Sequence, residues 1–194
     1  MTRTLSLLSA AILATMAAPA AAAPSETAVL AGGCFWGMEG VFEHVKGVGN
    51  VVSGYAGGTR SFSGGAKRTG FAEAVRISFD PSQVSYRQLL EIYFAVAHDP
   101  TQVDRQGPDV GPRYRSAIFP QSAEQKRIAQ QFLAASARRF SRPVSTRLES
   151  GGFDVAEPEH QDYLRKHPTA RYVVVNDLPK LAKLRRDYPQ YWRG

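Results

Sequence analysis

The sequence predicts one domain of the α+β or α/β sandwich class, with helices packed on a mixed sheet. Segments with the alternation of a strand and segments with the spacing of a helix follow one another along the chain. This mixed order is typical of a sheet covered by helices. No internal repeat or domain linker interrupts residues 23–194, and their length of about 170 residues is enough for one core.

Residues 1–22 have the pattern of a signal peptide for export. Arg3 supplies a basic start, residues 5–16 form an apolar run, and residues 20–22 give the small-x-small pattern of a cleavage site. We expect cleavage near Ala22 or Ala23 and a periplasmic or secreted protein. The run is shorter than the roughly 20 residues that span a membrane. No second run follows, so we expect no membrane attachment after cleavage.

The first elements of the domain follow from short patterns. Residues 27–31 are apolar and end at a glycine pair, which is typical of a buried strand. Residues 38–45 have apolar side chains at helical spacing, and the glycines of residues 47–50 end that helix. Residues 51–55 predict a second strand. The glycines at positions 54, 57, 58, 64 and 65 then predict a long flexible loop.

Residues 72–79 alternate clearly and predict a further strand. Val75, Ile77 and Phe79 share one face of it, and Glu73 falls on the same apolar face. Ser85 begins a helix, because Gln88 stands at the position that completes a capping box.

The second half of the domain predicts a functional loop and then further alternating elements. Residues 101–115 contain two glycines and two prolines and are too long for a plain connection. Loops of this length are often functional. The remaining predicted elements are strands at 116–119, 144–148 and 172–175, and helices at 122–140, 157–165 and 178–186.

Charge and histidine spacing exclude several classes of function. The net charge is +7, or +6 once Arg3 is removed, and the basic residues are spread out except for a mild cluster within residues 180–186. That cluster is typical of a solvated helix face, so we expect no nucleic-acid partner. The four histidines are widely spaced and the chain has one cysteine, so we expect no metal site.

The single cysteine, Cys34, is the leading candidate for chemistry. It follows a predicted strand and a glycine pair and precedes a predicted helix. Backbone N–H groups and the helix dipole at such a junction stabilise a thiolate and lower its pKa. The alternative is an inert buried cysteine, which is common in protein cores.

Five further residues are candidates for the same site. Phe35 and Trp36 are adjacent at a helix start and cannot both face the core, so one of them lines an opening, although tryptophan is also a common core residue. Glu73 in apolar surroundings would be neutral and could donate a proton, unless it reaches water at the strand edge. Asp109 and Tyr114 can project from the long loop into a cleft, although Asp beside Gly and Pro often only forms a turn.

These segments together resemble the A-type methionine sulfoxide reductases, the peptide-methionine (S)-S-oxide reductases. The resemblance covers nearly all of residues 23–194, with several motifs in the family's order. The matching segments are Gly33-Cys34-Phe35-Trp36-Gly37, Ser53-Gly54-Tyr55-Ala56-Gly57-Gly58, Gly70-Phe71-Ala72-Glu73-Ala74-Val75, His98-Asp99-Pro100-Thr101-Gln102, and the stretch from Arg105 to Ser116.

The resemblance implies a role for each candidate. Cys34 would attack the sulfoxide sulfur, and Glu73 would protonate the leaving oxygen. Phe35 and Trp36 would hold the S-methyl group. Asp109 would bind a backbone N–H of the substrate residue, and Tyr114 would hydrogen-bond the sulfoxide oxygen or a water near it. The implied fold is an α/β roll related to the ferredoxin-like plait. Substrates would be oxidised proteins, peptides or free methionine sulfoxide, and we expect a monomer.

The sequence departs from the family pattern in two places. The loop between the glycine turn and the Glu73 strand lacks the family's tyrosine, and Phe71 replaces its usual histidine. The C-terminal region has no cysteine to resolve a sulfenic acid as a disulfide. The resemblance therefore implies no bound cofactor and recycling by an external thiol, either a thioredoxin-like protein or a small thiol.

Two other classes of function remain open from the sequence. Cys34 could be the nucleophile of a hydrolase or acyltransferase, which would need a histidine within reach of the sulfur. The chain could also be a periplasmic peptide-binding module with an inert cysteine.

Overall fold

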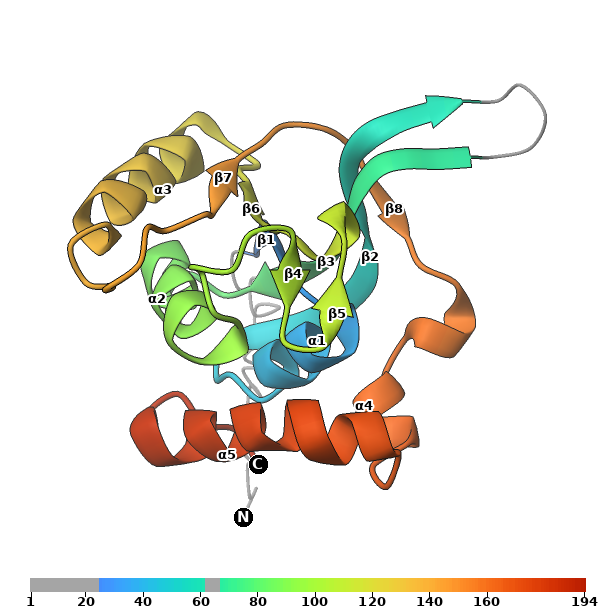
Figure 1. Cartoon of the computed structure of the whole chain (residues 1–194). Coiled ribbons are helices and arrows are strands. Elements are labelled where there is room, and N and C mark those ends of the chain that lie inside the picture. The colour runs from blue at the N-terminus through green and yellow to red at the C-terminus, as the bar shows by residue number, and fades with distance from the viewer. Residues whose placement is uncertain (1–24, 62–66) are drawn as a thin grey trace, which may run out of the picture.

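The computed structural model describes residues 25–61 and 67–194 (Figure 1), and the predicted signal peptide lies outside these residues. Within the described part of the chain, no helix is long and apolar enough to cross a membrane. The backbone of the fold is a β-α-β-β-α-β unit. Its elements are β1 (Glu26–Gly32), α1 (Phe35–Glu43), β2 (Val48–Ser61), β3 (Lys67–Phe79), α2 (Tyr86–Ile92) and β6 (Ser116–Phe119).

One six-stranded sheet organises the molecule, in the order β7-β6-β1-β3-β2-β8. The outer strands are β7 (Arg147–Leu148) and β8 (Phe153–Val155). Neighbouring strands are antiparallel except for β6 and β7, which are parallel. The central order β6-β1-β3-β2 together with the β-α-β-β-α-β connection is the ferredoxin-like plait. The predicted mixed sheet with packed helices is therefore confirmed.

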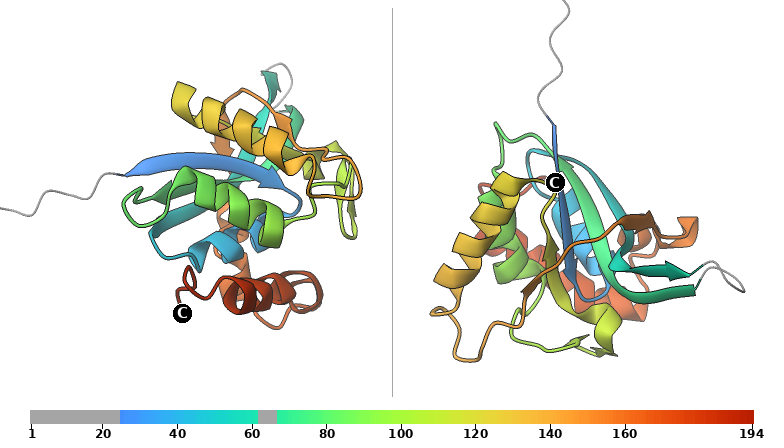
Figure 2. Two further views of the ribbon diagram at one scale, coloured as in Figure 1. Left: turned by 90° about the vertical axis from the view of Figure 1, so that its left-hand side faces the viewer. Right: turned by 90° about the horizontal axis from the view of Figure 1, so that it is seen from above.

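Alternation in β1 separates two cores. Ala28 and Leu30 belong to the large core under the helices, whereas Val29 and Ala31 belong to a small core on the opposite face. Figure 2 (left) shows α1 and α2 on the same side of β1, with α5 (Leu178–Asp187) beyond them. The helix α3 (Ala123–Ser136) packs beside α2 and contributes Phe132 to the large core.

The β2–β3 hairpin differs from the predicted loop. Gly54, Gly57 and Gly58 lie within β2, and the two strands remain paired as far as Ser61 and Lys67. Glycine in a strand marks a close approach of another backbone. A Cβ at Gly54 would meet the Phe153 ring and the Asp154 carbonyl of β8. The predicted loop was therefore wrong for these three glycines, and Gly64 and Gly65 lie outside the described residues.

The second half also shows differences from the predicted elements. The predicted strand at 172–175 is instead a π-helix, η4 (Val173–Asp177), which continues into α5. A short apolar run does not distinguish a strand from a buried helical segment. The predicted helix at 157–165 is broken into η3 (Pro158–His160) and α4 (Tyr163–Lys166), because Asp162 adopts a left-handed conformation with φ 56°. The helix α3 ends at Ser136 rather than near residue 140.

The long central loop contains its own structure. Before the loop, α2 continues into a second π-helical segment, η1 (Tyr93–Ala97). A two-stranded ribbon of β4 (Arg105–Gln106) and β5 (Asp109–Val110) then leads to the 3₁₀ turn η2 (Pro112–Tyr114). In Figure 1 this ribbon lies in front of the sheet, near α1. It brings loop residues to the end of β1.

Candidate active site

Cys34 lies at the junction of β1 and α1, where it is the N-cap residue of the helix. The preceding Gly33 has φ 91°, a conformation that favours glycine. A Cβ at Gly33 would also come within 2.5 Å of the Gln106 side chain. Glycine at position 33 therefore allows both the turn into the helix and the close packing of the central loop. The sulfur-bearing residue is unpaired and retains 8% exposure.

The surroundings of Cys34 favour the protonated thiol. Burial, together with the nearby carboxylates of Glu73 and Asp177, raises the pKa of Cys34 to about 12. The Trp36 backbone N–H and the Tyr172 hydroxyl hydrogen-bond the sulfur and oppose the rise. The predicted lowering of the pKa is therefore wrong, because burial and two carboxylates outweigh the donors at the helix start.

Glu73 is buried next to Cys34 on the helix-facing side of β3. It is 7% exposed, as the strand alternation predicts. One carboxylate oxygen, Oε2, accepts a hydrogen bond of 3.3 Å from the Phe35 backbone N–H. Burial raises the pKa of Glu73 to about 7, although this hydrogen bond and Arg113 oppose the rise. Near neutral pH a large fraction of Glu73 is therefore protonated and can donate a proton.

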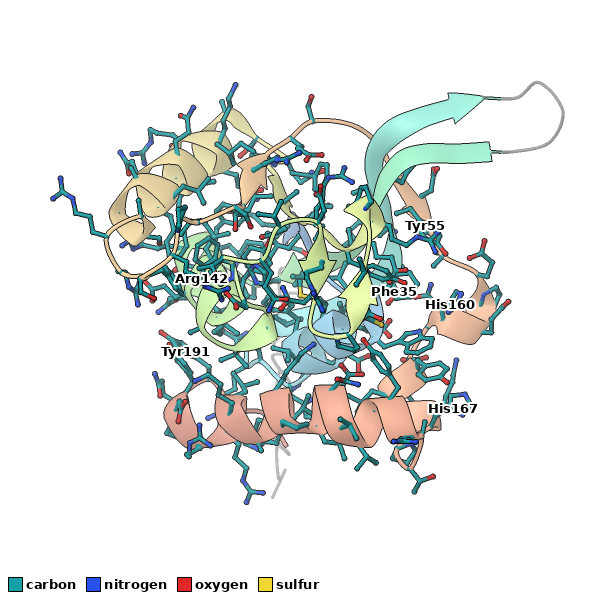
Figure 3. The ribbon with its side chains drawn as sticks, in the orientation of Figure 1. Phe35, Tyr55, Arg142, His160, His167 and Tyr191 are labelled. Carbon is teal, nitrogen blue, oxygen red and sulfur yellow. The ribbon has the colours of Figure 1, made fainter. Side chains whose placement is uncertain are left out.

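Phe35 and Trp36 form an aromatic wall with residues from distant parts of the chain. Phe35 is buried, with its ring 5.7 Å from Tyr55 and 5.2 Å from His160. These three residues gather on one side of the molecule in Figure 3. Half-buried Trp36 stacks on Tyr163 at 3.6 Å. Its Nε1 is buried and has no hydrogen-bond partner in the described structure. This wall is apolar and flat, which suits a thioether or a methyl group.

Asp109 and Tyr114 approach the same site from the central loop. Asp109 lies in β5, and its Oδ2 accepts a hydrogen bond from the Tyr172 hydroxyl. The half-buried Tyr114 lies in η2, and the pKa of its hydroxyl is raised by burial and by the charges of Glu73 and Asp109. The structure therefore brings all six predicted site residues into one region. Asp109 bonds another side chain across the site instead of only forming a local turn.

A buried arginine ties the loop to the strand that holds Glu73. Arg115 donates to both carboxylate oxygens of Glu149, at 2.9 and 2.7 Å. It also donates to the carbonyl oxygens of Pro112 and Gly70, each at 3.0 Å. The η2 turn and the start of β3 are therefore fixed relative to each other. A bidentate guanidinium–carboxylate pair holds its geometry firmly.

Sequence reasoning missed several residues that line the site. Tyr172, Tyr163 and His160 contact the Phe35–Trp36 wall or Cys34, and all three come from the C-terminal region. The apolar run at 172–175 predicts a strand that includes Tyr172, and no motif marks this residue. Only the tertiary packing of the C-terminal region against α1 brings these residues together.

The histidines do not favour a cysteine hydrolase. The two ring nitrogens of buried His98 contact the Tyr93 carbonyl at 2.8 Å and the Ser116 hydroxyl at 2.7 Å. The Nδ1 atom of His44 contacts the Gly40 carbonyl. His160 packs on aromatic rings. No group of three or more potential ligands could hold a metal ion within residues 25–61 and 67–194.

Comparisons with known proteins agree on one family. A family model described as peptide methionine sulfoxide reductase matches residues 26–191. The peptide methionine sulfoxide reductase MsrA 2 of Mesorhizobium japonicum is 51% identical, over 87% of this chain and 90% of that protein. The solved methionine sulfoxide reductase A of Corynebacterium diphtheriae has a TM-score of 0.66 and 34% identity, covering 74% of this chain and 76% of that one.

A yeast structure is similar to the same extent. The reduced form of Mxr1 from Saccharomyces cerevisiae has a TM-score of 0.65 and 30% identity, covering 75% of this chain and 87% of that one. Mxr1 is also known in complex with Trx2.

Proposed function

The chain belongs to the peptide methionine sulfoxide reductase family, and from that premise we propose that Cys34 and Glu73 perform the reaction. The protein reduces methionine sulfoxide. The observation that supports the assignment is the pairing of one thiol with one carboxyl of raised pKa. They lie side by side at the start of α1, where Phe35 links the helix to Glu73 through a hydrogen bond of 3.3 Å.

The reaction needs a nucleophile and an acid at the same place. The Cys34 sulfur attacks the sulfoxide sulfur, and Glu73 donates a proton to the sulfoxide oxygen. The oxygen leaves the substrate, so that methionine is released and Cys34 becomes a sulfenic acid. The substrate sulfur gains two electrons and the cysteine sulfur loses two.

Substrate binding also changes the ionisation of Cys34. The carboxylate form of Glu73 is the second-largest cause of the high Cys34 pKa. A neutral Glu73 that is hydrogen-bonded to the sulfoxide oxygen does not repel the thiolate. The Trp36 N–H and the Tyr172 hydroxyl can then stabilise the anion.

The other predicted residues orient the substrate. Phe35 and Trp36, with Tyr163 stacked behind Trp36, provide the apolar surface for the S-methyl group. Tyr114 lies near Glu73 and can donate to the sulfoxide oxygen. Asp109 accepts a backbone N–H of the substrate residue, which gives the enzyme access to protein-bound as well as free methionine sulfoxide.

The epimer assay tests the proposed function. We expect the purified protein with dithiothreitol to consume the S epimer of a blocked methionine sulfoxide and to leave the R epimer. The family resemblance implies the S epimer, and an aromatic wall on one side of Cys34 supports discrimination between the two. Chromatography of both epimers measures this directly. Consumption of neither epimer would refute the reductase assignment, and consumption of the R epimer alone would refute the stereochemistry.

Recycling requires a second thiol from outside the chain. Cys34 is the only cysteine of the sequence, so its sulfenic acid cannot form a disulfide within the chain. A thioredoxin-like protein or a small thiol supplies the electrons, and no bound cofactor is needed. The known complex of Mxr1 with Trx2 supports a thioredoxin-like reductant.

Location and assembly are part of the same proposal. Residues 1–22 direct export, and residues 23–194 act as one catalytic domain in the periplasm or outside the cell. We also propose that the enzyme works as a monomer.

A further inference from the structure

The Tyr172 hydroxyl lies between the nucleophile and the substrate-binding carboxylate. It donates a hydrogen bond to Asp109 Oδ2 and is within hydrogen-bond reach of the Cys34 sulfur. Its ring meets Trp36 edge to face at 5.7 Å. Tyr172 directly precedes η4, so the packing of the C-terminal region against α1 fixes its position.

A tyrosine hydroxyl has one proton to donate. In the structure that proton is bonded to Asp109, so little of it is available to the sulfur, and the Tyr172 hydroxyl is accordingly the weakest of the groups that act on the Cys34 pKa. If Asp109 takes another donor, the same proton can turn to the sulfur. An O–H bonded to sulfur favours the thiolate. The direction of one hydroxyl therefore shifts the balance between the thiol and the thiolate of Cys34.

We propose that Tyr172 is a further catalytic residue whose O–H group is held by Asp109 and turns to hydrogen-bond the Cys34 sulfur when Asp109 binds the substrate backbone, while the proton stays on the tyrosine. This inference rests on the proposed function of Asp109 and Cys34. It couples recognition of the methionine residue to formation of the nucleophile.

The other groups around Cys34 cannot act as a hydrogen-bond donor that changes direction. Glu73 from β3 and Asp177 from η4 both disfavour the thiolate. The cations nearby act on those carboxylates: Arg113 on Glu73, and Lys180 on Asp177 at 3.4 Å. Among the described residues, only the Trp36 N–H and the Tyr172 hydroxyl are seen to favour the anion. The Trp36 N–H is fixed in the backbone, so Tyr172 is the donor that can change direction.

Thiol ionisation in a double-mutant cycle tests the proposal without turnover. The four proteins are wild type, Tyr172→Phe, Asp109→Ala and the double variant. The readouts are the pH midpoint of Cys34 alkylation by iodoacetamide and the ultraviolet absorbance of the thiolate. The single cysteine makes both signals unambiguous.

We expect Asp109→Ala to lower the midpoint by about one to two pH units when Tyr172 is present, because the freed hydroxyl then bonds the sulfur. In the Tyr172→Phe background the same change should lower the midpoint by less than half as much. Equal shifts in both backgrounds would mean that Asp109 acts only through its charge, and would overturn the proposal.

Two further measurements keep the test decisive. The first uses a blocked methionine sulfone, which binds but is not reduced. It should lower the midpoint of Cys34 alkylation in wild type and lower it clearly less in Tyr172→Phe. This comparison replaces the cycle if Asp109→Ala does not fold. Equal lowering in both proteins would again overturn the proposal. Tyr188→Phe, in a half-buried tyrosine outside the site, is the matched control and should leave the midpoint unchanged. Failure of the reductase assignment would appear separately, as absent sulfoxide reduction by wild type.

Discussion

Replacement of Cys34 by serine should abolish methionine sulfoxide reduction. A serine hydroxyl is much less acidic than a thiol and cannot form a sulfenic acid, so neither the attack nor the electron transfer can occur. The chain has no other cysteine to take over. Release of methionine from a blocked methionine sulfoxide in the presence of dithiothreitol measures the effect.

The control for this variant is a measurement of its thermal unfolding. Cys34 is 8% exposed and serine differs from it by one atom, so we expect the thermal unfolding midpoint to change by only a few degrees. A folded Cys34→Ser protein that still reduces sulfoxide at an appreciable rate would contradict the role of the sulfur.

Replacement of Glu73 by glutamine should lower kcat/KM by about 10²–10⁴-fold, because a positioned acid contributes that much to a step that needs proton transfer. The same change should make Cys34 easier to alkylate, since the Glu73 carboxylate raises the pKa of the thiol. Reduction thus becomes slower while the nucleophile becomes easier to ionise. Alkylation rates and sulfoxide turnover measured side by side reveal this split.

The pH dependence follows from the same residue. The neutral form of Glu73 is the active form, and its pKa is about 7. In the substrate-bound enzyme, where Cys34 is already the thiolate, kcat should therefore fall as the pH rises through that value. Glutamine does not titrate, so the variant should lack this fall. If both proteins lost activity over the same pH range, or if Glu73→Gln slowed alkylation and reduction equally, Glu73 would not be the proton donor.

Local patterns predicted the fold well where strands alternate or helices carry caps. The capping box of Ser85 and Gln88 is present as predicted, and β6 has its predicted bounds. The pattern failed where tertiary contacts decide the conformation. The glycines of β2 lie in a strand that pairs with β3, and β8 packs closely against Gly54. The strand β8 itself is only three residues long. No local signal marks so short a strand.

The site was predictable to the extent that motifs marked it. Cys34, Glu73 and the two aromatic residues at the start of α1 could be named from position and alternation. The charge state of Cys34 could not, because it depends on Asp177 and Glu73, which lie far from it in sequence. Tyr172 was missed for the same reason. The predicted low pKa of Cys34 took account of the hydrogen-bond donors at the helix start. It left out burial and the carboxylates that packing brings next to the sulfur.

The yield of methionine in a single turnover tests the central claim most directly. The reduced enzyme is freed of thiol, given excess methionine S-sulfoxide, and analysed for released methionine and for the mass of the peptide that contains Cys34. We expect about one methionine per enzyme and one added oxygen on that peptide, with no disulfide within the chain. A yield near two methionines, or a Cys34 peptide of unchanged mass after methionine release, would contradict attack by this lone sulfur.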